Sequence, residues 1–341
     1  MMNRRSFIKS LGGTLALAAA PLSIARACSA RVMVVGGGVG GTRAAAYLKM
    51  SMPSAEITLF EPAYKYSTNN YHAIKNRYKP VDYAVLNELG INVVAEKVEQ
   101  IDPVDKSVYL AGGKCYKGDA LLVAPGIDFK WNEISGLQSG MENHVTHAWL
   151  HSNSENQLWY EVKEMQDGKN VVITVPAAPY RFPQGPYQRA TKIASYLKQY
   201  KPKSRVIILD GNNHFPSRNI FQAKWQSELT GNRVEWVSRN NGGEFERVDI
   251  QNKRIYLGGD YLKAGVLNII PPQQAGKIAR SAGLTDKYDW CHVRSHTLES
   301  VHYRNVFVVG DANNVDVFNK TAAATQKDVL KCVNGLKALL T

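Results

Sequence analysis

Three glycines at a fixed spacing are the residues whose pattern most directly indicates chemistry. Gly36, Gly38 and Gly41 follow the apolar residues 32–35, and a helical pattern begins directly after them, at 42–49. In a strand, turn and helix of this kind, the glycines form a tight turn, let the backbone approach a pyrophosphate, and allow the helix to pack closely on the strand. The free N–H groups and positive dipole end of the helix also favour phosphate. The pattern therefore favours a dinucleotide site over a purely structural glycine turn.

Two carboxylates follow predicted strands that belong with this turn. The strand 55–60 leads into Glu61, 20 residues after Gly41, where a carboxylate accepts both ribose hydroxyls of an adenosine. The strand 305–309 delivers Asp311 to the carboxyl edge of the sheet, where open α/β sheets bind ligands. Asp311 could instead cap the next helix. Taken with the glycine turn, its position favours an acceptor for the ribityl hydroxyls of a flavin.

The elements that must position these residues form an α/β protein. The chain of 341 residues is too long for one compact core, and its 44% apolar residues and 27 glycines are typical of this class. We predict two Rossmann-like dinucleotide-binding domains, with the FAD domain split into 28–145 and 259–341 around a second domain at 146–258. A buried strand at 119–124 ends in the turn Pro125–Gly126 and closes the first segment. No stretch after the first 30 residues is long and apolar enough to span a bilayer.

The second domain has the pattern of a nucleotide-binding unit without its fingerprint. Strands are predicted at 171–175 and 205–209, with a helix at 187–200 between them. The turns after the two strands, 176–185 and 210–213, lack the glycine spacing that lets a pyrophosphate approach. We therefore expect no NAD(P)H site, so electrons must enter and leave by another route.

A helix at 320–340 is predicted to close the chain. Val329, Val333, Leu336 and Leu340 lie along one of its faces, which indicates core packing. Its N-terminal end should point toward an isoalloxazine ring, where partial positive charge would stabilise a reduced, anionic flavin.

The first 27 residues are typical of an export signal and are excluded from the fold. A twin-arginine pattern lies at 3–9, an apolar run covers 11–24, and 25–27 form an A-x-A cleavage site. The alternatives are an ordinary basic signal peptide, or a cytoplasmic chain with an apolar start. The twin-arginine interpretation predicts a periplasmic protein that is exported already folded.

Charge and cysteine spacing restrict the partners. Removing residues 1–27 deletes Arg4, Arg5, Lys9 and Arg26 and no acid, so the formal charge falls from +13 to +9. We expect no nucleic-acid partner for an exported chain. A merely soluble basic surface remains the simplest interpretation, and an acidic protein partner is the functional one. The four cysteines form no C-x-x-C pair or zinc ribbon, and no C-x-x-C-H occurs, so this chain attaches no c-type haem itself.

Seven segments distributed over the mature chain match one family. They are VVGGGVGG at 34–41, FEP at 60–62, LLVAPGI at 121–127, PAAPYRFPQGPYQRA at 176–190, KPKSRVIILD at 201–210, IIPPQQAGKIARSAGL at 269–284 and VFVVGDA at 306–312. In these segments the chain resembles the flavoprotein subunit of flavocytochrome c sulfide dehydrogenase, a periplasmic relative of sulfide:quinone reductases. The resemblance implies FAD, an export signal, a haem-bearing cytochrome subunit and sulfide oxidation. The cofactor site that we predict comprises Gly36, Gly38, Val39, Gly40, Gly41, Glu61, Asn69, Val98, Pro125, Gly126, Gly310 and Asp311.

The chain departs from the family pattern where the family places its functional cysteines. The family tethers its flavin through a cysteine whose matching position here is Asn69, so we expect non-covalent FAD. It places one redox cysteine where this chain has Phe182, and the other in a C-terminal module beyond the last helix. We expect that module to be missing beyond Thr341, and Cys332 to be a small core residue. Oxidation of sulfide through a cysteine persulfide is therefore doubtful, and we assign no catalytic residue and no metal ligand.

The sequence thus predicts an exported, FAD-dependent, oxidoreductase-like subunit that transfers electrons to or from a c-type cytochrome or similar carrier. A reduced sulfur compound is the substrate that the resemblance implies. The alternative is a catalytically degenerate homologue that serves as a structural or assembly partner of a periplasmic redox complex.

Overall fold

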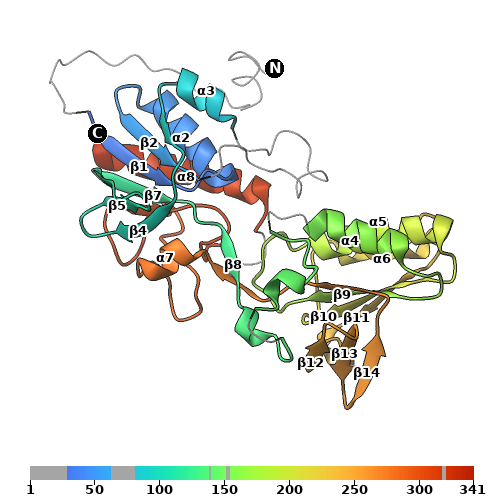
Figure 1. Cartoon of the computed structure of the whole chain (residues 1–341). Coiled ribbons are helices and arrows are strands. Elements are labelled where there is room, and N and C mark those ends of the chain that lie inside the picture. Colours follow the sequence, from blue (N-terminus) through green and yellow to red (C-terminus); the bar gives the residue numbers. More distant parts are fainter. Residues whose placement is uncertain (1–28, 63–80, 138–139, 151–153, 317–319) are drawn as a thin grey trace.

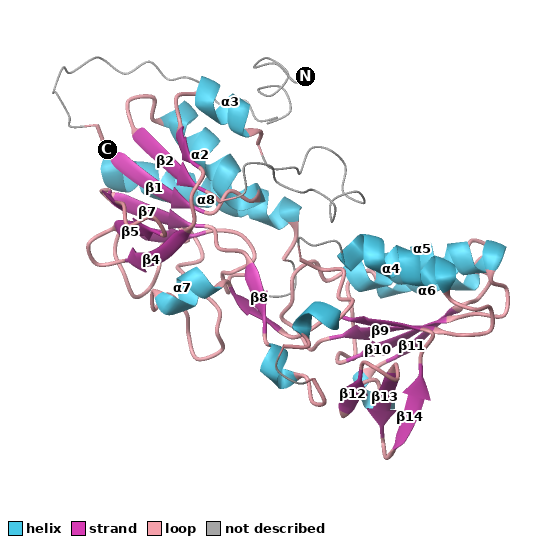
Figure 2. Ribbon diagram, viewed as in Figure 1, coloured by secondary structure: helices cyan, strands magenta, loops and turns pink. Residues whose placement is uncertain are grey.

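The computed structural model describes residues 29–62, 81–137, 140–150, 154–316 and 320–341, which form two α/β domains (Figures 1 and 2). The first domain is built on a parallel sheet with the strand order β17-β7-β1-β2-β3. Because β17 comes from the far end of the chain, this domain is assembled from two separated segments, as predicted. Its strands are β1 (Arg31–Val35), β2 (Glu56–Phe60), β3 (Asn92–Val94), β7 (Ala120–Val123) and β17 (Val306–Val308).

Two helices from opposite ends of the sequence pack together against this sheet. They are α2 (Val39–Ser51) and α8 (Ala322–Leu340), blue and red in Figure 1. The apolar face of α8 is buried at Val329, Val333 and Leu336, which confirms the predicted packing stripe there. A three-stranded antiparallel sheet shares the same core. The remaining elements of this domain are α3 (Tyr83–Glu88), β4 (Val98–Asp102), β5 (Ser107–Leu110), β6 (Cys115–Lys117) and α7 (Lys277–Ser281).

The second domain has a parallel sheet covered on both faces. Helices pack on one face and a small antiparallel sheet on the other, and each interface has its own apolar core (Figure 1). The strand order is β11-β10-β9-β15. Its elements are α4 (Ser154–Glu164), β9 (Val171–Val175), α5 (Gly185–Tyr200), β10 (Val206–Asp210), α6 (Arg218–Gln226), β11 (Val234–Val237), β12 (Arg247–Asp249), β13 (Arg254–Leu257), β14 (Asp260–Lys263) and β15 (Val266–Ile269). Short 3₁₀ segments lie at Trp131–Glu133, Glu142–His144 and Arg239–Asn241.

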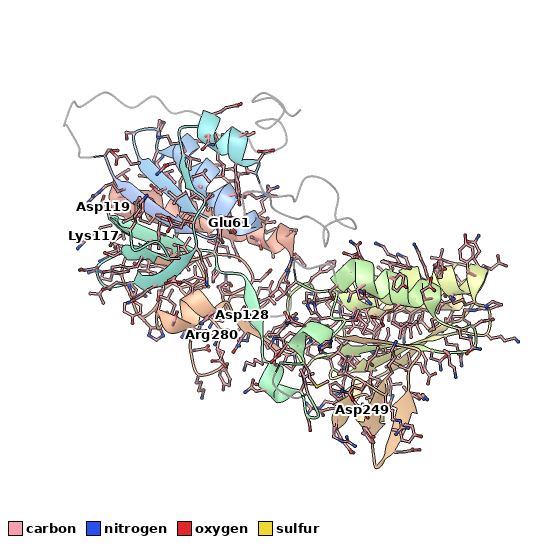
Figure 3. The ribbon with its side chains drawn as sticks, in the orientation of Figure 1. Glu61, Lys117, Asp119, Asp128, Asp249 and Arg280 are labelled. Atoms are coloured by element: carbon pink, nitrogen blue, oxygen red, sulfur yellow. The ribbon has the colours of Figure 1, made fainter. Side chains whose placement is uncertain are left out.

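The chain crosses between the domains twice, and the two crossings pair with each other. They are β8 (Ile127–Phe129) and β16 (Gln273–Ala275), which form an antiparallel ladder. Asp128 and Arg280 lie together at this crossover (Figure 3), with Arg280 Nη2 3.2 Å from Asp128 Oδ2. The crossover therefore ties the two domains through main-chain bonds as well as an ion pair.

Both predicted domain boundaries are displaced. The strand β15 pairs with β9 inside the second sheet, so the second domain continues past the predicted end at 258. On the other side, Trp131 and Ile134 already pack in a core of the second domain, ahead of the predicted start at 146. The predicted end at 258 falls too early because a short apolar run identifies a buried strand but not the sheet that receives it.

The segment 90–98 contributes to two sheets. Its first part forms β3 in the parallel sheet, and Val98 begins β4 in the antiparallel sheet. Alternating and continuous apolar patterns follow each other here without a break, so the sequence does not show where the chain leaves one sheet for another.

None of the helices in the described residues is long and apolar enough to cross a membrane.

A buried polar cluster occupies the carboxyl edge of the second sheet. Asp210, fully buried at the end of β10, accepts hydrogen bonds from Tyr187 Oη at 2.6 Å, Trp236 Nε1 at 2.7 Å and Asn212 Nδ2 at 2.8 Å. The ring of Tyr187 stacks on Phe215 with centroids 3.7 Å apart. Aromatic side chains therefore fill the edge where a Rossmann-like domain would hold a nucleotide, in agreement with the missing fingerprint.

We predict that Tyr187→Phe lowers the free energy of unfolding by about 1–3 kcal/mol near neutral pH, because a buried carboxylate loses a donor. Burial raises the pKa of Asp210, and the hydrogen bonds from Tyr187, Trp236 and Asn212 oppose the rise. A raised pKa in the folded state means that stability is lost as pH rises through it. Removing the Tyr187 hydroxyl raises the pKa of Asp210 further. The substitution should therefore lower the free energy of unfolding more at about pH 7 than at about pH 4.

Urea unfolding of the FAD-loaded protein at both pH values measures this difference. Tyr200→Phe is the matched control, because Tyr200 lies on the same helix and is 58% exposed. An equal effect of the two substitutions would show that the hydroxyl of Tyr187 does not stabilise Asp210.

Candidate functional site

A cavity of about 620 Å³ lies between the two domains. Residues from the carboxyl edge of the first sheet line one part of it, and residues from α4, α5 and the loop 176–184 line the other. Of the residues predicted to hold the cofactor, those that line the cavity are Gly36, Gly38, Val39, Gly40, Glu61, Val98, Pro125, Gly126, Gly310 and Asp311. Asn69 lies outside the described residues.

The glycine turn has the geometry that a pyrophosphate requires. Gly36 has a φ of +103°, and a Cβ there would lie 2.3 Å from the carbonyl oxygen of Ala124. Gly41 does not line the cavity, but a Cβ on it would lie 1.8 Å from the oxygen of Gly36, so a side chain would separate α2 from the turn. At the start of α2, Gly38 provides no side-chain cap and the first turn carries no acid. This helix end therefore fits an anionic group.

Glu61 is held at the end of β2 by the same turn (Figure 3). The N–H of Gly37 donates to Glu61 Oε2 at 2.7 Å. A Cβ on Gly37 would lie 2.5 Å from the hydroxyl oxygen of Tyr83 and 2.6 Å from Cγ of Glu61. Gly37 was not among the predicted residues, although its place in a run of three glycines signalled it. The oriented carboxylate fits the ribose of an adenosine.

Asp311 lies where the two domains meet. Its Oδ2 is 3.3 Å from Nε of Arg181, which comes from the loop after β9 in the second domain. Burial raises the pKa of Asp311, and the positive charges of Arg181 and Lys320 oppose that rise. Arg181 also uses its main-chain N–H to donate to Gln273 Oε1 at 2.7 Å. Sequence reasoning missed Arg181, because only the tertiary structure brings it beside Asp311.

Lys320 is a second cation that sequence reasoning did not assign. It is buried, and its Nζ donates to the carbonyl oxygens of Asp311 and Asn313 and lies 4.3 Å from the centre of the Trp290 ring. Burial lowers its pKa to about 8, against the attraction of Asp311. The next residue, Thr321, caps α8 by accepting from the N–H of Ala324 at 3.2 Å. The cation and the start of α8 therefore bring positive charge to the cavity, as predicted for the helix end.

Phe182 lines the cavity at the position of the expected thiol. Its φ is +54°, and its N–H donates to the carbonyl oxygen of Lys320 at 2.8 Å. No cysteine lines the cavity in the described ranges: Cys115 is exposed on β6, and Cys291 and Cys332 are buried. Burial raises the pKa of Cys291 to about 12 and that of Cys332 further, so neither is a ready thiolate.

The described residues contain no cluster of three or more His, Cys, Asp or Glu that could hold a metal ion. The groups that face the cavity are instead the glycine turn, the carboxylate of Glu61 and a second carboxylate, Asp311, at the sheet edge. Together with the split fold, these groups fit FAD and define a flavoprotein oxidoreductase of the two-dinucleotide-binding fold.

Comparison with known proteins identifies the relatives within this class. The central part of the sulfide dehydrogenase [flavocytochrome c] flavoprotein chain matches residues 156–271, and the pyridine nucleotide-disulphide oxidoreductase family matches residues 30–174. The chain is therefore a flavoprotein related to sulfide dehydrogenase and to sulfide:quinone oxidoreductases, and FAD is its cofactor.

Curated relatives and a solved structure agree with this relation. The mitochondrial sulfide:quinone oxidoreductase of Dictyostelium discoideum is 24% identical over 309 residues, which cover 86% of this chain and 67% of that protein. The sulfide-quinone reductase of Aquifex aeolicus is 23% identical over 311 residues, covering 86% and 71%. The X-ray structure of the Aquifex aeolicus enzyme superposes with a TM-score of 0.70 at 20% identity, covering 92% of this chain and 77% of that one.

We predict that Asp311→Ala weakens FAD binding by about 1.5–3 kcal/mol, because ribityl hydroxyls lose a charge-assisted acceptor. Titration of the apo protein with FAD measures the change in Kd. Asp105→Ala is the control: Asp105 also pairs with a cation, Lys117 at 3.4 Å, but it lies on an exposed turn outside the cavity. Equal FAD affinity in both variants would contradict the assignment of Asp311.

Proposed function

We propose that this chain is the FAD-bearing electron-transfer subunit of an exported redox complex. In this proposal it takes electrons from a reduced sulfur compound and passes them to a c-type cytochrome or a similar carrier. The proposal rests on two features that occur together. One is a cavity that fits FAD, and the other is a second domain in which aromatic side chains fill the carboxyl edge of the sheet, where a nucleotide would bind. Tyr187 and Phe215 occupy that edge, which supports a flavin without a pyridine nucleotide partner.

A separate carrier for single electrons follows from this arrangement. When bound, FAD supplies an acceptor for two electrons that can be released one at a time. The chain's own groups bind and orient this cofactor through the glycine turn, Glu61 and Asp311, and close the cavity with the loop 176–184. The twin-arginine pattern at 3–9 supports a compartment where c-type cytochromes mature, and the charge of +9 on residues 28–341 supports an acidic partner.

Phe182 also supports a second candidate function. An aromatic ring in place of a cysteine leaves no disulfide for sulfide to attack among the described lining residues. A catalytically degenerate homologue, kept as a structural or assembly partner of a redox complex, would have the same feature. A visible spectrum of the native protein, purified with its partners, distinguishes the two. A bound, reducible flavin supports the first function, whereas a colourless protein that copurifies with partners supports the second.

We predict that neither NADH nor sulfide reduces the bound flavin rapidly. Aromatic side chains fill the carboxyl edge of the second sheet, where NADH would bind, and no cysteine lines the cavity among the residues that the structure describes. Phe182→Cys should not restore rapid reduction by sulfide, because a disulfide needs a second thiol with its Cα within about 7 Å. Anaerobic stopped-flow mixing, monitored at the flavin band, measures all three reactions. Rapid reduction of Phe182→Cys alone would show that a second thiol does reach the cavity, and rapid bleaching by NADH would refute the filled cleft.

We also predict that a haem-containing protein copurifies with the chain from periplasm at low salt and is lost at high salt. Exposed charge pairs are screened over about 8–10 Å at physiological ionic strength, so added salt weakens such a complex. Haem absorbance in the eluate is the measurement, and sucrose at equal osmolality is the control. Recovery of the flavoprotein alone under mild salt counts against the proposed acceptor.

A further inference from the structure

A series of oxidisable side chains leads from the cavity into the interior of the second domain. Trp149 is buried and lines the cavity together with the residues that fit FAD. The centre of its ring lies 6.5 Å from that of Tyr180, in the loop 176–184. The hydroxyl oxygen of Tyr180 lies 3.4 Å from that of Tyr187 on α5. Because tryptophan and tyrosine are among the side chains that lose one electron most readily, these three residues form a continuous path for an electron. We call it the inner aromatic path.

Tyr187 has the proton acceptor that an oxidised tyrosine needs. A tyrosine that loses an electron also releases its hydroxyl proton, because the phenol cation is a very strong acid. The hydroxyl of Tyr187 donates to Asp210 Oδ2 at 2.6 Å, and burial raises the pKa of Asp210. Both side chains are fully buried. The carboxylate can therefore take the proton, and the surrounding protein shields the tyrosine ring from solvent.

The first two members of the path are less suitable places for an oxidised ring. The guanidinium carbon of Arg189 lies 5.4 Å from the centre of the Trp149 ring. Its positive charge, which Glu155 partly offsets, disfavours a second positive charge on that ring. The hydroxyl of Tyr180 lies 3.3 Å from the carbonyl oxygen of Pro183 and bonds to no carboxylate among the described residues. An oxidised Trp149 is therefore expected to take an electron from further along the path.

The path ends at Tyr187 rather than at the next tryptophan. The Nε1 of Trp236 also donates to Asp210 Oδ2, at 2.7 Å. However, the guanidinium carbon of Arg218 lies 4.5 Å from the centre of the Trp236 ring, and this positive charge disfavours oxidation of the indole. Tyr187 is thus the buried ring that combines a carboxylate partner with no cation over its face among the described residues.

A second series of aromatic rings leaves the cavity but lacks such a partner. Trp159 also lines the cavity, and its ring centre lies 6.1 Å from that of Tyr196. The ring of Tyr196 lies 4.7 Å from that of Tyr200, which is exposed. In the part of the chain that the structure describes, neither tyrosine hydroxyl donates to a carboxylate. This outer aromatic path therefore provides a comparison within the same molecule.

We infer that the inner aromatic path, with Asp210 as its proton acceptor, supplies one electron to FAD when the cofactor absorbs blue light. Trp149 loses an electron to the excited FAD, and Tyr187 replaces that electron through Tyr180. The hydroxyl proton of Tyr187 passes to Asp210 Oδ2. The products are FAD with one added electron, a neutral tyrosyl radical and a protonated carboxyl group. The inference goes beyond the proposed function, because it needs bound FAD but neither a substrate nor a partner.

The test excites the FAD-loaded protein with a blue laser flash, without oxygen and without an added reductant. The tyrosyl radical is recorded by its transient absorption and by its EPR spectrum. The native protein should form the radical, and Tyr187→Phe should lose most of it. Trp149→Phe should also lose most of it and should lengthen the fluorescence lifetime of the flavin, because the first electron donor of the path is gone. Equal radical yields in the native protein and Tyr187→Phe, or no radical in the native protein, overturn the inference.

Tyr200→Phe is the matched control, because Tyr200 lies on the same helix as Tyr187 and ends the outer aromatic path. This variant should keep the native yield, and a loss of the radical there would overturn the inference in favour of the outer path. A measurement on the native protein after full exchange into D₂O does not depend on the folding of any variant. Radical formation should slow, since the hydroxyl proton leaves with the electron. An unchanged rate would overturn the role of Asp210.

Discussion

The site depends above all on the contact between the loop 176–184 and the segment that precedes α8. Arg181 pairs with Asp311 at 3.3 Å, and the N–H of Phe182 donates to the carbonyl oxygen of Lys320 at 2.8 Å. These bonds join the second domain to the carboxyl edge of the first sheet. They hold Phe182 beside the residues of the first domain that line the same cavity. A half-buried ion pair of this kind contributes more to geometry than to net stability.

The carboxyl edges of the two parallel sheets differ in what occupies them. In the first domain, glycines leave space and free N–H groups at the carboxyl edge of the sheet. In the second, side chains take that space: Asp210 gathers hydrogen bonds from Tyr187 and Trp236, and Phe215 stacks on the tyrosine ring. A satisfied buried carboxylate with aromatic neighbours agrees with the glycine fingerprint that the sequence lacks in this domain. The second domain then serves as a wall for the flavin cavity.

Charge is distributed unevenly around that cavity. Asp311 is paired, whereas Lys320 and Arg189 are bonded to neutral oxygens, so their positive charges remain. The positive end of α8 adds to them. Such an environment favours the anionic reduced form of a flavin, because these cations are desolvated, although the carboxylates of Asp311 and Glu155 offset part of the positive charge.

Much of this protein was determined by local patterns in the sequence. The glycine spacing, Glu61 and Asp311 could be assigned because each follows a strand and needs only the rule that parallel strands end at one edge. The split first domain followed in the same way. The sequence did not show which sheet receives β15 or that the chain changes sheets after β3, because a short apolar run does not indicate which strand it pairs with. It also did not show that Arg181 meets Asp311, because the two residues are far apart in the sequence. Only the tertiary structure decided which side chains of the second domain face the cavity, since that depends on how two domains pack across the β8 and β16 crossover.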